Sequence, residues 1–347
     1  MFILDAILTL VHYKINSFAL MNQSKINFWE IKSETDFELC AMQTFHHQYE
    51  NNSIYRSYCD LIHFNPSDLK SSQDIPFLPI GFFKTHEVKS FDGTAAVVFT
   101  SSGTTGSKTS KHFVKQIEDY KNSFANAFTL FYENPKEIVI LALLPSYLER
   151  EGSSLIYMAD DLIKESNHVK SGFYLNNLDE LKDVLLELEA EQQPTLLLGV
   201  SFALLDMVEK FNFKLKSTIV METGGMKGRR KELIREDLHQ QLSKGFGLEQ
   251  IHSEYGMTEL LSQAYSKGNG FFSCPPWMQV FIRDTSDPFT KLRIGMMGNI
   301  NVIDLANRES CAFIATQDLG RKHSLNKFEV LGRLDHSEIR GCNLLVY

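Results

Sequence analysis

Two alternating patterns of hydrophobic residues fill the middle of the chain. Continuous apolar runs of strand length cover 137–144, 195–200 and 218–221. Apolar residues at helical spacing cover 178–191, 201–211 and 229–243, with Asn176 or Asn177 as a cap for the first helix and Gly245 as a stop for the last. Uninterrupted apolar strands are typical of a sheet buried on both faces. Strands alternating with helices therefore predict an α/β fold with a largely parallel sheet.

The flanking regions follow other patterns. Residues 21–60 contain helical spacing, and 61–85 contain three prolines and predict an extended connection. From about residue 270 the apolar runs become shorter and β-like, at 279–282, 298–305 and 311–315. They predict a β-rich subdomain, and no obvious linker separates it from the parallel part.

The first 20 residues are apolar but short. Asp5 interrupts the run and no basic cluster precedes it, which argues against a signal peptide. The run is also too short to span a bilayer. Because a more polar sequence opens at Met21, we expect residues 1–20 to be an extension, with either Met1 or Met21 as the start.

Composition excludes several classes of protein. With 43% hydrophobic and 22% charged residues, the 347-residue chain has the composition of a globular protein. A net charge of −8 argues against a general nucleic-acid binder, which needs a basic face. The five cysteines are scattered with no C-x-x-C pair, which argues against a disulfide scaffold and a zinc site and favours a cytoplasmic location.

A loop of hydroxyls and glycines follows a β-branched run at Val97–Thr100. It consists of Ser101, Ser102, Gly103, Thr104, Thr105 and Gly106, and Lys108 and Lys111 come just after it. Glycines let backbone N–H groups approach an anion, hydroxyls add donors, and a lysine supplies charge. A helix predicted over 115–131 would point its N-terminus toward negative charge. The pattern indicates a phosphate cradle, although the spacing differs from an ordinary P-loop and a polar surface turn is the alternative.

A second motif reads Tyr255-Gly256-Met257-Thr258-Glu259. Together with the loop at 101–106, it resembles the adenylate-forming (acyl-CoA synthetase) superfamily. The resemblance implies that Tyr255 stacks on adenine beside Gly256, that the Thr258 hydroxyl binds the α-phosphate, and that Glu259 holds Mg²⁺. These roles suit an aromatic ring, a hydroxyl and a carboxylate.

Three further segments match the same superfamily in chain order. Gly224 and Gly225 resemble its glycine turn beside adenine, and a strand-ending turn is the alternative. Asp318 matches an aspartate that binds the ribose, although Gln317 replaces the usual glycine. Arg333 matches a ribose-contacting arginine at a hinge, in the segment 331–341. The proline-rich stretch at 75–80, followed by Phe82, Phe83 and Lys84, resembles the entry segment of the phenylacetate-ligase branch, and a surface loop is the alternative.

The resemblance implies the large N-terminal domain of the adenylate-forming fold over 21–330, with the β-rich subdomain at about 270–330. It also implies activation of a carboxylic acid with ATP and Mg²⁺. Most members continue past the hinge into a small domain with a catalytic lysine. Because this chain ends at Tyr347, we expect that domain to be missing. Either Lys108 or Lys111 then takes the lysine's place, or the first half-reaction is slow, or the protein is a degenerate relative.

The LuxE acyl-protein synthetase family also stops near this point, and the chain resembles it most. Its members activate fatty acids and acylate a cysteine near their own C-terminus, from which a reductase partner receives the acyl group. Cys342, in the hinge and tail segment 331–347, matches that cysteine and can act as a thiolate nucleophile. A buried strand cysteine is the alternative. His252 can assist the thiolate, line the acyl pocket or be structural. The other functions that we consider are a phenylacetate-type CoA ligase and a non-catalytic nucleotide-binding relative.

Overall fold

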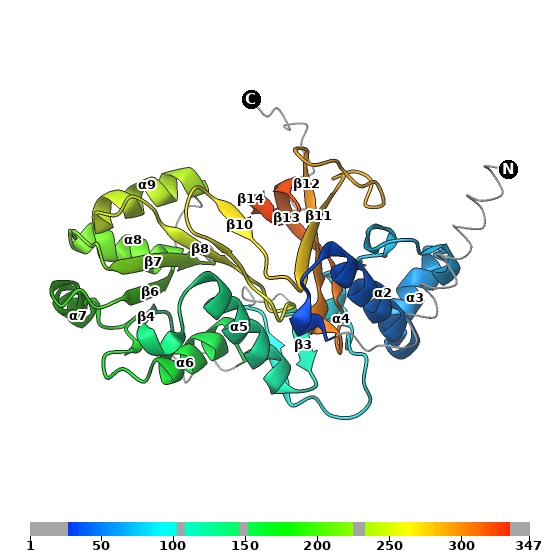
Figure 1. Cartoon of the computed structure of the whole chain (residues 1–347), viewed down its shortest axis with the longest axis horizontal. Helices are drawn as coiled ribbons and strands as arrows, with labels where there is room; N and C mark the ends of the chain where they lie inside the picture. The colour runs from blue at the N-terminus through cyan, green and yellow to red at the C-terminus, as the bar shows by residue number, and fades with distance from the viewer. Residues whose placement is uncertain (1–26, 103–107, 146–151, 225–232, 334–347) are drawn as a thin grey trace.

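The computed structural model describes residues 27–102, 108–145, 152–224 and 233–333 (Figure 1). One large mixed sheet runs through them, in the order β11-β12-β13-β14-β10-β9-β8-β7-β6-β4-β5. Strand β1 (Leu78–Pro79) pairs with β13 beside this path, and β2 (Val97–Thr100) and β3 (Lys111–Val114) form a separate hairpin.

The first half of the large sheet is parallel, as the apolar runs predicted. Its strands are β4 (Val139–Leu143), β5 (Gly172–Phe173), β6 (Thr195–Val200), β7 (Thr218–Thr223) and β8 (His252–Tyr255). Every residue of β4 and β6 is buried, which explains why these strands contain no polar alternation.

The second half is antiparallel and confirms the β-rich C-terminal part. Its strands are β9 (Ala264–Ser266), β10 (Phe271–Ser273), β11 (Met278–Arg283), β12 (Met297–Asp304), β13 (Phe313–Ser324) and β14 (Lys327–Arg333). The antiparallel pairing of β8 with β9 joins the two halves into one sheet.

Helices cover both faces of the parallel half. Figure 1 shows α5 (Ile117–Phe131) and α6 (Ser154–Ser166) on one face, and α8 (Ser201–Lys210) and α9 (Arg235–Phe246) on the other. The remaining helices are α7 (Leu178–Ala190), which Asn177 caps, and α2 (Glu34–Asn51), α3 (Ser53–Leu61) and α4 (Phe82–Thr85). Phe45 of α2 and Tyr55 of α3 contact Phe313, which packs these helices against the antiparallel half.

Three expectations about elements were wrong. The last predicted helix begins at Arg235 rather than 229 and ends at Gly247, which has a φ of 72°. Gly245 lies inside the helix rather than at its end. The glycine lets α9 pack closely against α8, since a Cβ there would lie 2.3 Å from the Cβ of Val208. Strand β3 separates the 101–106 loop from α5, so the N-terminus of that helix does not directly follow the loop. Residues 327–333 form a strand that the sequence pattern did not predict.

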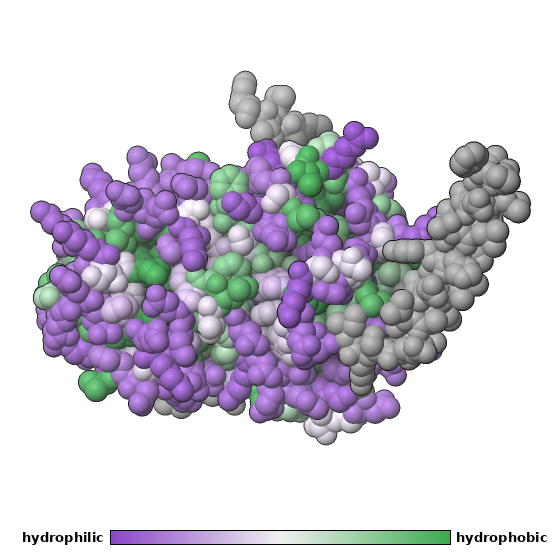
Figure 2. Space-filling view, in the orientation of Figure 1, coloured by the Kyte–Doolittle hydropathy of each residue, from purple (hydrophilic) through white to green (hydrophobic). Residues whose placement is uncertain are grey.

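The face in Figure 2 is largely hydrophilic, and its hydrophobic residues form small separate groups. Among the described residues, none of the helices has the length and apolar character needed to cross a bilayer.

Candidate active site

The candidate phosphate loop is the tip of the β2–β3 hairpin. Ser101 closes its base, because its Oγ accepts from the Ser110 N–H at 2.9 Å and its own N–H donates to the Ser110 carbonyl at 3.2 Å. Ser102 is exposed, as are Lys108 and Lys111, and neither lysine forms an ion pair with another described residue. The remaining loop residues that the sequence singled out, Gly103, Thr104, Thr105 and Gly106, lie outside the described part of the chain.

The carboxyl of Glu259 lies where three segments meet. The Ser110 side chain at the base of the hairpin, Arg333 on β14 and Lys84 on α4 lie close enough to this carboxyl for each to lower its pKa. Its side chain is only 6% exposed. Burial raises the pKa of Glu259, while Ser110, Arg333 and Lys84 partly oppose that rise. The hairpin and the second motif, far apart in sequence, therefore share one carboxyl.

Tyr255, Asp318 and Arg333 also come together. The Tyr255 hydroxyl donates to Asp318 Oδ2 at 2.8 Å, and Asp318 is the direct cross-strand partner of Arg333. Burial raises the pKa of Asp318, against the Tyr255 bond and the charge of Arg333. Arg333 also donates to the side chain of Gln317 at 3.2 Å. Since Tyr255 is only 8% exposed, the face available for stacking is small, and stacking on adenine stays a prediction.

A buried polar chain holds the Thr258–Glu259 backbone from behind. His112 of β3 lies with Nδ1 2.7 Å from the Thr258 carbonyl and Nε2 2.8 Å from Asn307 Oδ1. Asn307 Nδ2 donates to the carbonyls of Glu259 at 2.7 Å and Cys311 at 2.9 Å. Burial lowers the pKa of His112 to about 4. This chain fixes the candidate phosphate- and metal-binding residues relative to the hairpin.

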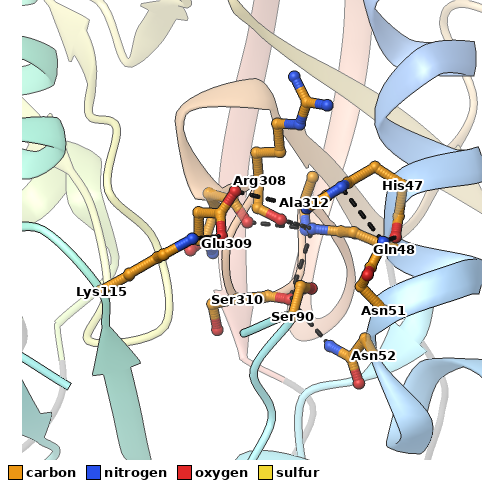
Figure 3. A network of polar contacts seen from close by, with 11 residues as sticks. His47, Gln48, Asn51, Asn52, Ser90, Lys115, Arg308, Glu309, Ser310 and Ala312 are labelled. Atoms are coloured by element: carbon orange, nitrogen blue, oxygen red, sulfur yellow. Dashed lines mark hydrogen bonds and ion pairs between the residues drawn. The ribbon is translucent and has the colours of Figure 1, made fainter. Parts of the chain in front are cut away.

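Helix α2 in turn fixes the loop that carries Asn307. Gln48 points from α2 into the loop 307–312 (Figure 3), donates to the Arg308 carbonyl at 2.8 Å and accepts from the Ala312 N–H at 3.1 Å. On the other side of the loop, Lys115 pairs with Glu309 at 2.8 Å. The side chain of Gln48 is fully buried, so these bonds replace its contacts with water.

The neighbouring ends of β7 and β8 carry two acidic side chains on opposite faces of the sheet. Glu222 faces α9, where it lies 3.6 Å from Arg235 Nε and 3.5 Å from His239 Nε2. Burial alone would raise the pKa of Glu222, but His239 and Arg235 outweigh it and lower that pKa. Glu254 lies on the other face. Its carboxylate accepts from Thr223 Oγ1 at 2.5 Å, and burial raises its pKa to about 7.

Gly224 follows β7 directly. It has a φ of 68°, in the left-handed region, and its carbonyl accepts from Ser201 Oγ at 2.6 Å. This is consistent with the strand-ending turn, and the approach of an adenine stays a prediction. Gly225 lies outside the described residues.

The comparisons with known proteins agree with this arrangement. The chain matches the crystal structure of 2-hydroxyisobutyryl-CoA ligase in the postadenylation state in complex with 2-HIB-AMP, with a TM-score of 0.63 and 12% identity, over 87% of this chain and 68% of that one. It also matches ATP-bound MatB from Rhodopseudomonas palustris, with a TM-score of 0.50 and 18% identity, over 70% and 49%. The fold is that of the adenylate-forming ligases.

The family model described as acyl-protein synthetase, LuxE, matches residues 16–129. The resemblance to both groups is therefore confirmed. A search of curated protein sequences finds no match. The chain spans about half the length of the MatB structure.

Within the adenylate-forming fold, the sequence motifs found most of the residues that gather at this site but missed those that support them. Ser110 and His112 lie just beyond the loop. The only available signal for them was the alternation of these two residues with Lys111 at the start of the short strand β3. Asn307 had no such signal, and Lys84 was noted only as part of the segment that resembles the phenylacetate-ligase branch, because the proximity of both residues to Glu259 arises only in the fold.

Two predicted residues are not tested by this geometry. Cys342 lies outside the described residues, so its role stays a prediction. His252 lies beside Tyr132, with Nδ1 3.2 Å from its hydroxyl, and burial lowers the pKa of His252 to about 4. A neutral, hydrogen-bonded imidazole favours the structural interpretation of His252.

Proposed function

We propose that the chain joins a carboxylic acid to ATP, forming an acyl-adenylate and pyrophosphate, and then transfers the acyl group to the thiol of Cys342. The observation that carries the first step is the meeting of Ser110, Glu259 and Arg333 beside the pair Tyr255–Asp318. Tyr255 and Glu259 come from the second motif, and Asp318 and Arg333 from two further segments, each of which has a nucleotide-binding counterpart in the superfamily. The resemblance to LuxE proteins supports the second step and suggests a fatty acid as the acyl donor.

In the first step, a carboxylate oxygen attacks the α-phosphorus, and the bond from that phosphorus to the bridging oxygen of pyrophosphate breaks. The step transfers no proton, so the site has to hold the reactants in line and stabilise negative charge. We assign the hairpin loop and Lys108 or Lys111 to the phosphates, and the Thr258 hydroxyl to the α-phosphate. Asp318 and Arg333 would hold the ribose hydroxyls, with Gly224 and Gly256 close to the base.

The surroundings of Glu259 fit a magnesium ion held largely by the nucleotide. Among the described residues, no group of three or more His, Cys, Asp or Glu side chains could hold a metal. Mg²⁺ commonly uses one or two carboxylates and completes its shell with phosphate oxygens and water. Glu259 supplies one such carboxylate, and the phosphates would have to offset the positive charges of Arg333 and Lys84 beside it for the ion to bind. Bound there, Mg²⁺ would supply positive charge to the phosphates.

In the second step, the Cys342 thiolate attacks the carbonyl carbon of the acyl-adenylate. The bond between that carbon and the phosphate oxygen breaks, AMP leaves, and a thioester remains on the protein. An acyl-accepting protein, such as a reductase partner of the LuxE type, would then take up the acyl group.

The deciding experiment is the intact mass of the protein after incubation with Mg-ATP and a mixture of carboxylic acids, without CoA. We expect an acyl adduct on the wild type that neutral hydroxylamine removes. Cys342→Ser should show no adduct, whereas Cys274→Ser should still be acylated. Cys274 is a suitable control, because it is the one described cysteine that is not fully enclosed by the fold.

The same samples, with carboxylate-dependent exchange of pyrophosphate into ATP, distinguish the alternatives. If pyrophosphate exchange occurs without an adduct, and a free thioester forms once CoA is added, the protein is a phenylacetate-type CoA ligase and does not acylate Cys342. If the protein binds nucleotide but shows no pyrophosphate exchange with any acid, it is a non-catalytic nucleotide-binding relative.

A further inference from the structure

The face of the sheet beneath α5 collects polar side chains that the proposed reaction does not use. Glu254 on β8 pairs directly with Thr223 on β7 and with Tyr265 on β9, so the three side chains share this face. Gln263 belongs to the same group, because a Cβ on Gly256 would lie 3.4 Å from its Cγ. Helix α5 covers the face with aromatic residues, including Tyr132, whose ring lies 5.4 Å from that of Tyr265.

Two buried atoms of this group have no hydrogen-bond partner in the described part of the chain. Tyr265 is 2% exposed and Gln263 is 4% exposed, yet the Tyr265 hydroxyl and Gln263 Oε1 make no hydrogen bond. Within the described residues, Glu254 accepts only the Thr223 bond, at Oε2. Buried polar atoms are nearly always paired, so two unsatisfied positions on one face require an explanation.

The missing partners are mainly donors. The amide oxygen of Gln263 is an acceptor, the Tyr265 hydroxyl can either accept or donate, and the Glu254 carboxyl, whose pKa burial raises to about 7, is an acceptor through both oxygens once it is ionised. A ligand that satisfies the set must therefore bring N–H or O–H groups. Residue Glu254 is half-buried, whereas Ser253 beside it is fully buried.

The location also points to a ligand. Thr223 and Glu254 lie at the carboxyl ends of the parallel strands β7 and β8, immediately before Gly224 and Tyr255. Ligands of open α/β sheets bind at this edge. Residue 256 is a glycine, and a Cβ there would lie 2.3 Å from Glu254 Oε1, so a side chain would displace the carboxylate.

We propose that Glu254, Gln263 and Tyr265 form a subsite for a hydrogen-bond-donating group, an ammonium or a hydroxyl, carried by the carboxylic acid that the chain activates. The subsite rests on the proposed function, since it defines the class of acid that enters the adenylation reaction. The substrate class is an amino- or hydroxy-substituted acid rather than an unsubstituted fatty acid.

The first arm of the test compares matched acids in carboxylate-dependent pyrophosphate exchange. The probes are straight-chain acids of three to twelve carbons, each unsubstituted, hydroxylated or aminated at successive positions. We expect at least one substituted acid to exceed its unsubstituted counterpart about tenfold or more in kcat/KM, the effect of one hydrogen bond to a charged group. The amino and hydroxyl members distinguish an ammonium from a neutral donor.

The second arm uses variants. Glu254→Gln and Tyr265→Phe should each lower kcat/KM for the preferred acid severalfold, mainly through KM, and change the unsubstituted acid little. Tyr132→Phe is the matched control, because its hydroxyl lies on the same face but already bonds to His252. It should leave the preference unchanged.

The outcomes separate the two levels of proposal. Exchange that favours unsubstituted acids, or a preference that survives both Glu254→Gln and Tyr265→Phe, overturns the subsite and leaves acid activation intact. A fall in melting temperature in Tyr265→Phe with unchanged preference would assign the hydroxyl to a structural water and also overturn it. No exchange with any acid overturns the proposed function, and the subsite with it.

Discussion

Two buried polar networks flank the Tyr255–Glu259 segment, and they differ in how completely their atoms are paired. Behind the segment, Gln48 both donates and accepts, Asn307 donates to two carbonyls, and the neutral ring of His112 donates to one of the two oxygens that face its nitrogens. Under α5, Gln263 and Tyr265 leave buried atoms unpaired. A fully paired network adds rigidity and specifies one arrangement, whereas an unpaired one costs stability unless a ligand completes it. The comparison therefore separates a supporting network from a recognition surface.

The largest effect should come from breaking the paired network at Asn307. Asn307→Leu removes both carbonyl donors and the oxygen facing His112, and leaves those buried groups unsatisfied. We expect a loss of about 3 kcal/mol in the free energy of unfolding, because each buried unpaired group costs roughly 1–3 kcal/mol. Urea unfolding measures it.

Asn51→Ala is the matched control for Asn307→Leu. Asn51 also donates to a backbone carbonyl, that of His47, but at the surface, so we expect a change within about 0.5 kcal/mol. Because Asn307 holds the Glu259 carbonyl, we also expect a higher KM for Mg-ATP in pyrophosphate exchange. Equal free energies of unfolding for the two variants would show that the hydrogen bonds of Asn307 do not stabilise the fold.

A smaller loss should follow from Gln48→Leu. The Ser310 carbonyl keeps bonds from Asn52 at 2.9 Å and Ser90 at 2.9 Å, so only part of the loop loses its partners. We expect about 2 kcal/mol of destabilisation, mostly from the unpaired Ala312 N–H and Arg308 carbonyl. Gln48→Glu keeps an acceptor for the Ala312 N–H but loses the donors. A loss from Gln48→Leu that exceeded that of Asn307→Leu would contradict this ranking.

The element order and the candidate site were largely predictable, because both depend on local signals. The buried run at 195–200 and the capped helix at Leu178–Ala190 carry their patterns within one element. The four-residue strand β3 does not, because its alternating burial extends over too few residues to distinguish it from the helix that follows. Short strands are therefore the elements that pattern predicts least well.

The supporting residues of the site could not be predicted. His112 contacts Thr258 146 positions away and Asn307 195 positions away, and neither contact leaves a trace in the neighbouring sequence. Glu254 stood beside a recognised motif, yet only the register of β7, β8 and β9 shows which face it occupies and what surrounds it.

Glu254→Gln should change stability in the opposite direction to the first two variants. The folded protein holds the Glu254 proton up to about pH 7, whereas a free glutamate loses it near pH 4.5. Between these values the folded state binds more protons than the unfolded state, so this group lowers stability as pH rises through the window. We expect Glu254→Gln to be about 1–2 kcal/mol more stable than wild type at pH 8, after allowance for the partial exposure of the side chain.

Other titratable groups near the Glu254 carboxyl do not account for the expected pH dependence of this stability difference. On the same face they are Tyr120 from α5, Tyr132 just after it, His252 on β8 and Tyr265 from β9, and Glu222 of β7 acts from the opposite face. The pKa of each tyrosine is raised, that of Glu222 is lowered, and that of His252 falls to about 4. Urea unfolding of both proteins at several values from pH 5 to pH 8 isolates Glu254, and a difference that does not grow with pH would contradict its assignment.

The smallest change, and the sharpest contrast, should come from removing single hydroxyls beneath α5. The Tyr120 hydroxyl donates to the Ser154 carbonyl at 2.9 Å, so Tyr120→Phe should cost about 1 kcal/mol. The Tyr265 hydroxyl has no partner, so Tyr265→Phe removes only a desolvated polar group and should be neutral or slightly stabilising, by up to about 0.5 kcal/mol. Thermal unfolding of the two variants compares them directly. If Tyr265→Phe cost as much as Tyr120→Phe, the hydroxyl would be paired in solution, and the contrast between the two networks would disappear.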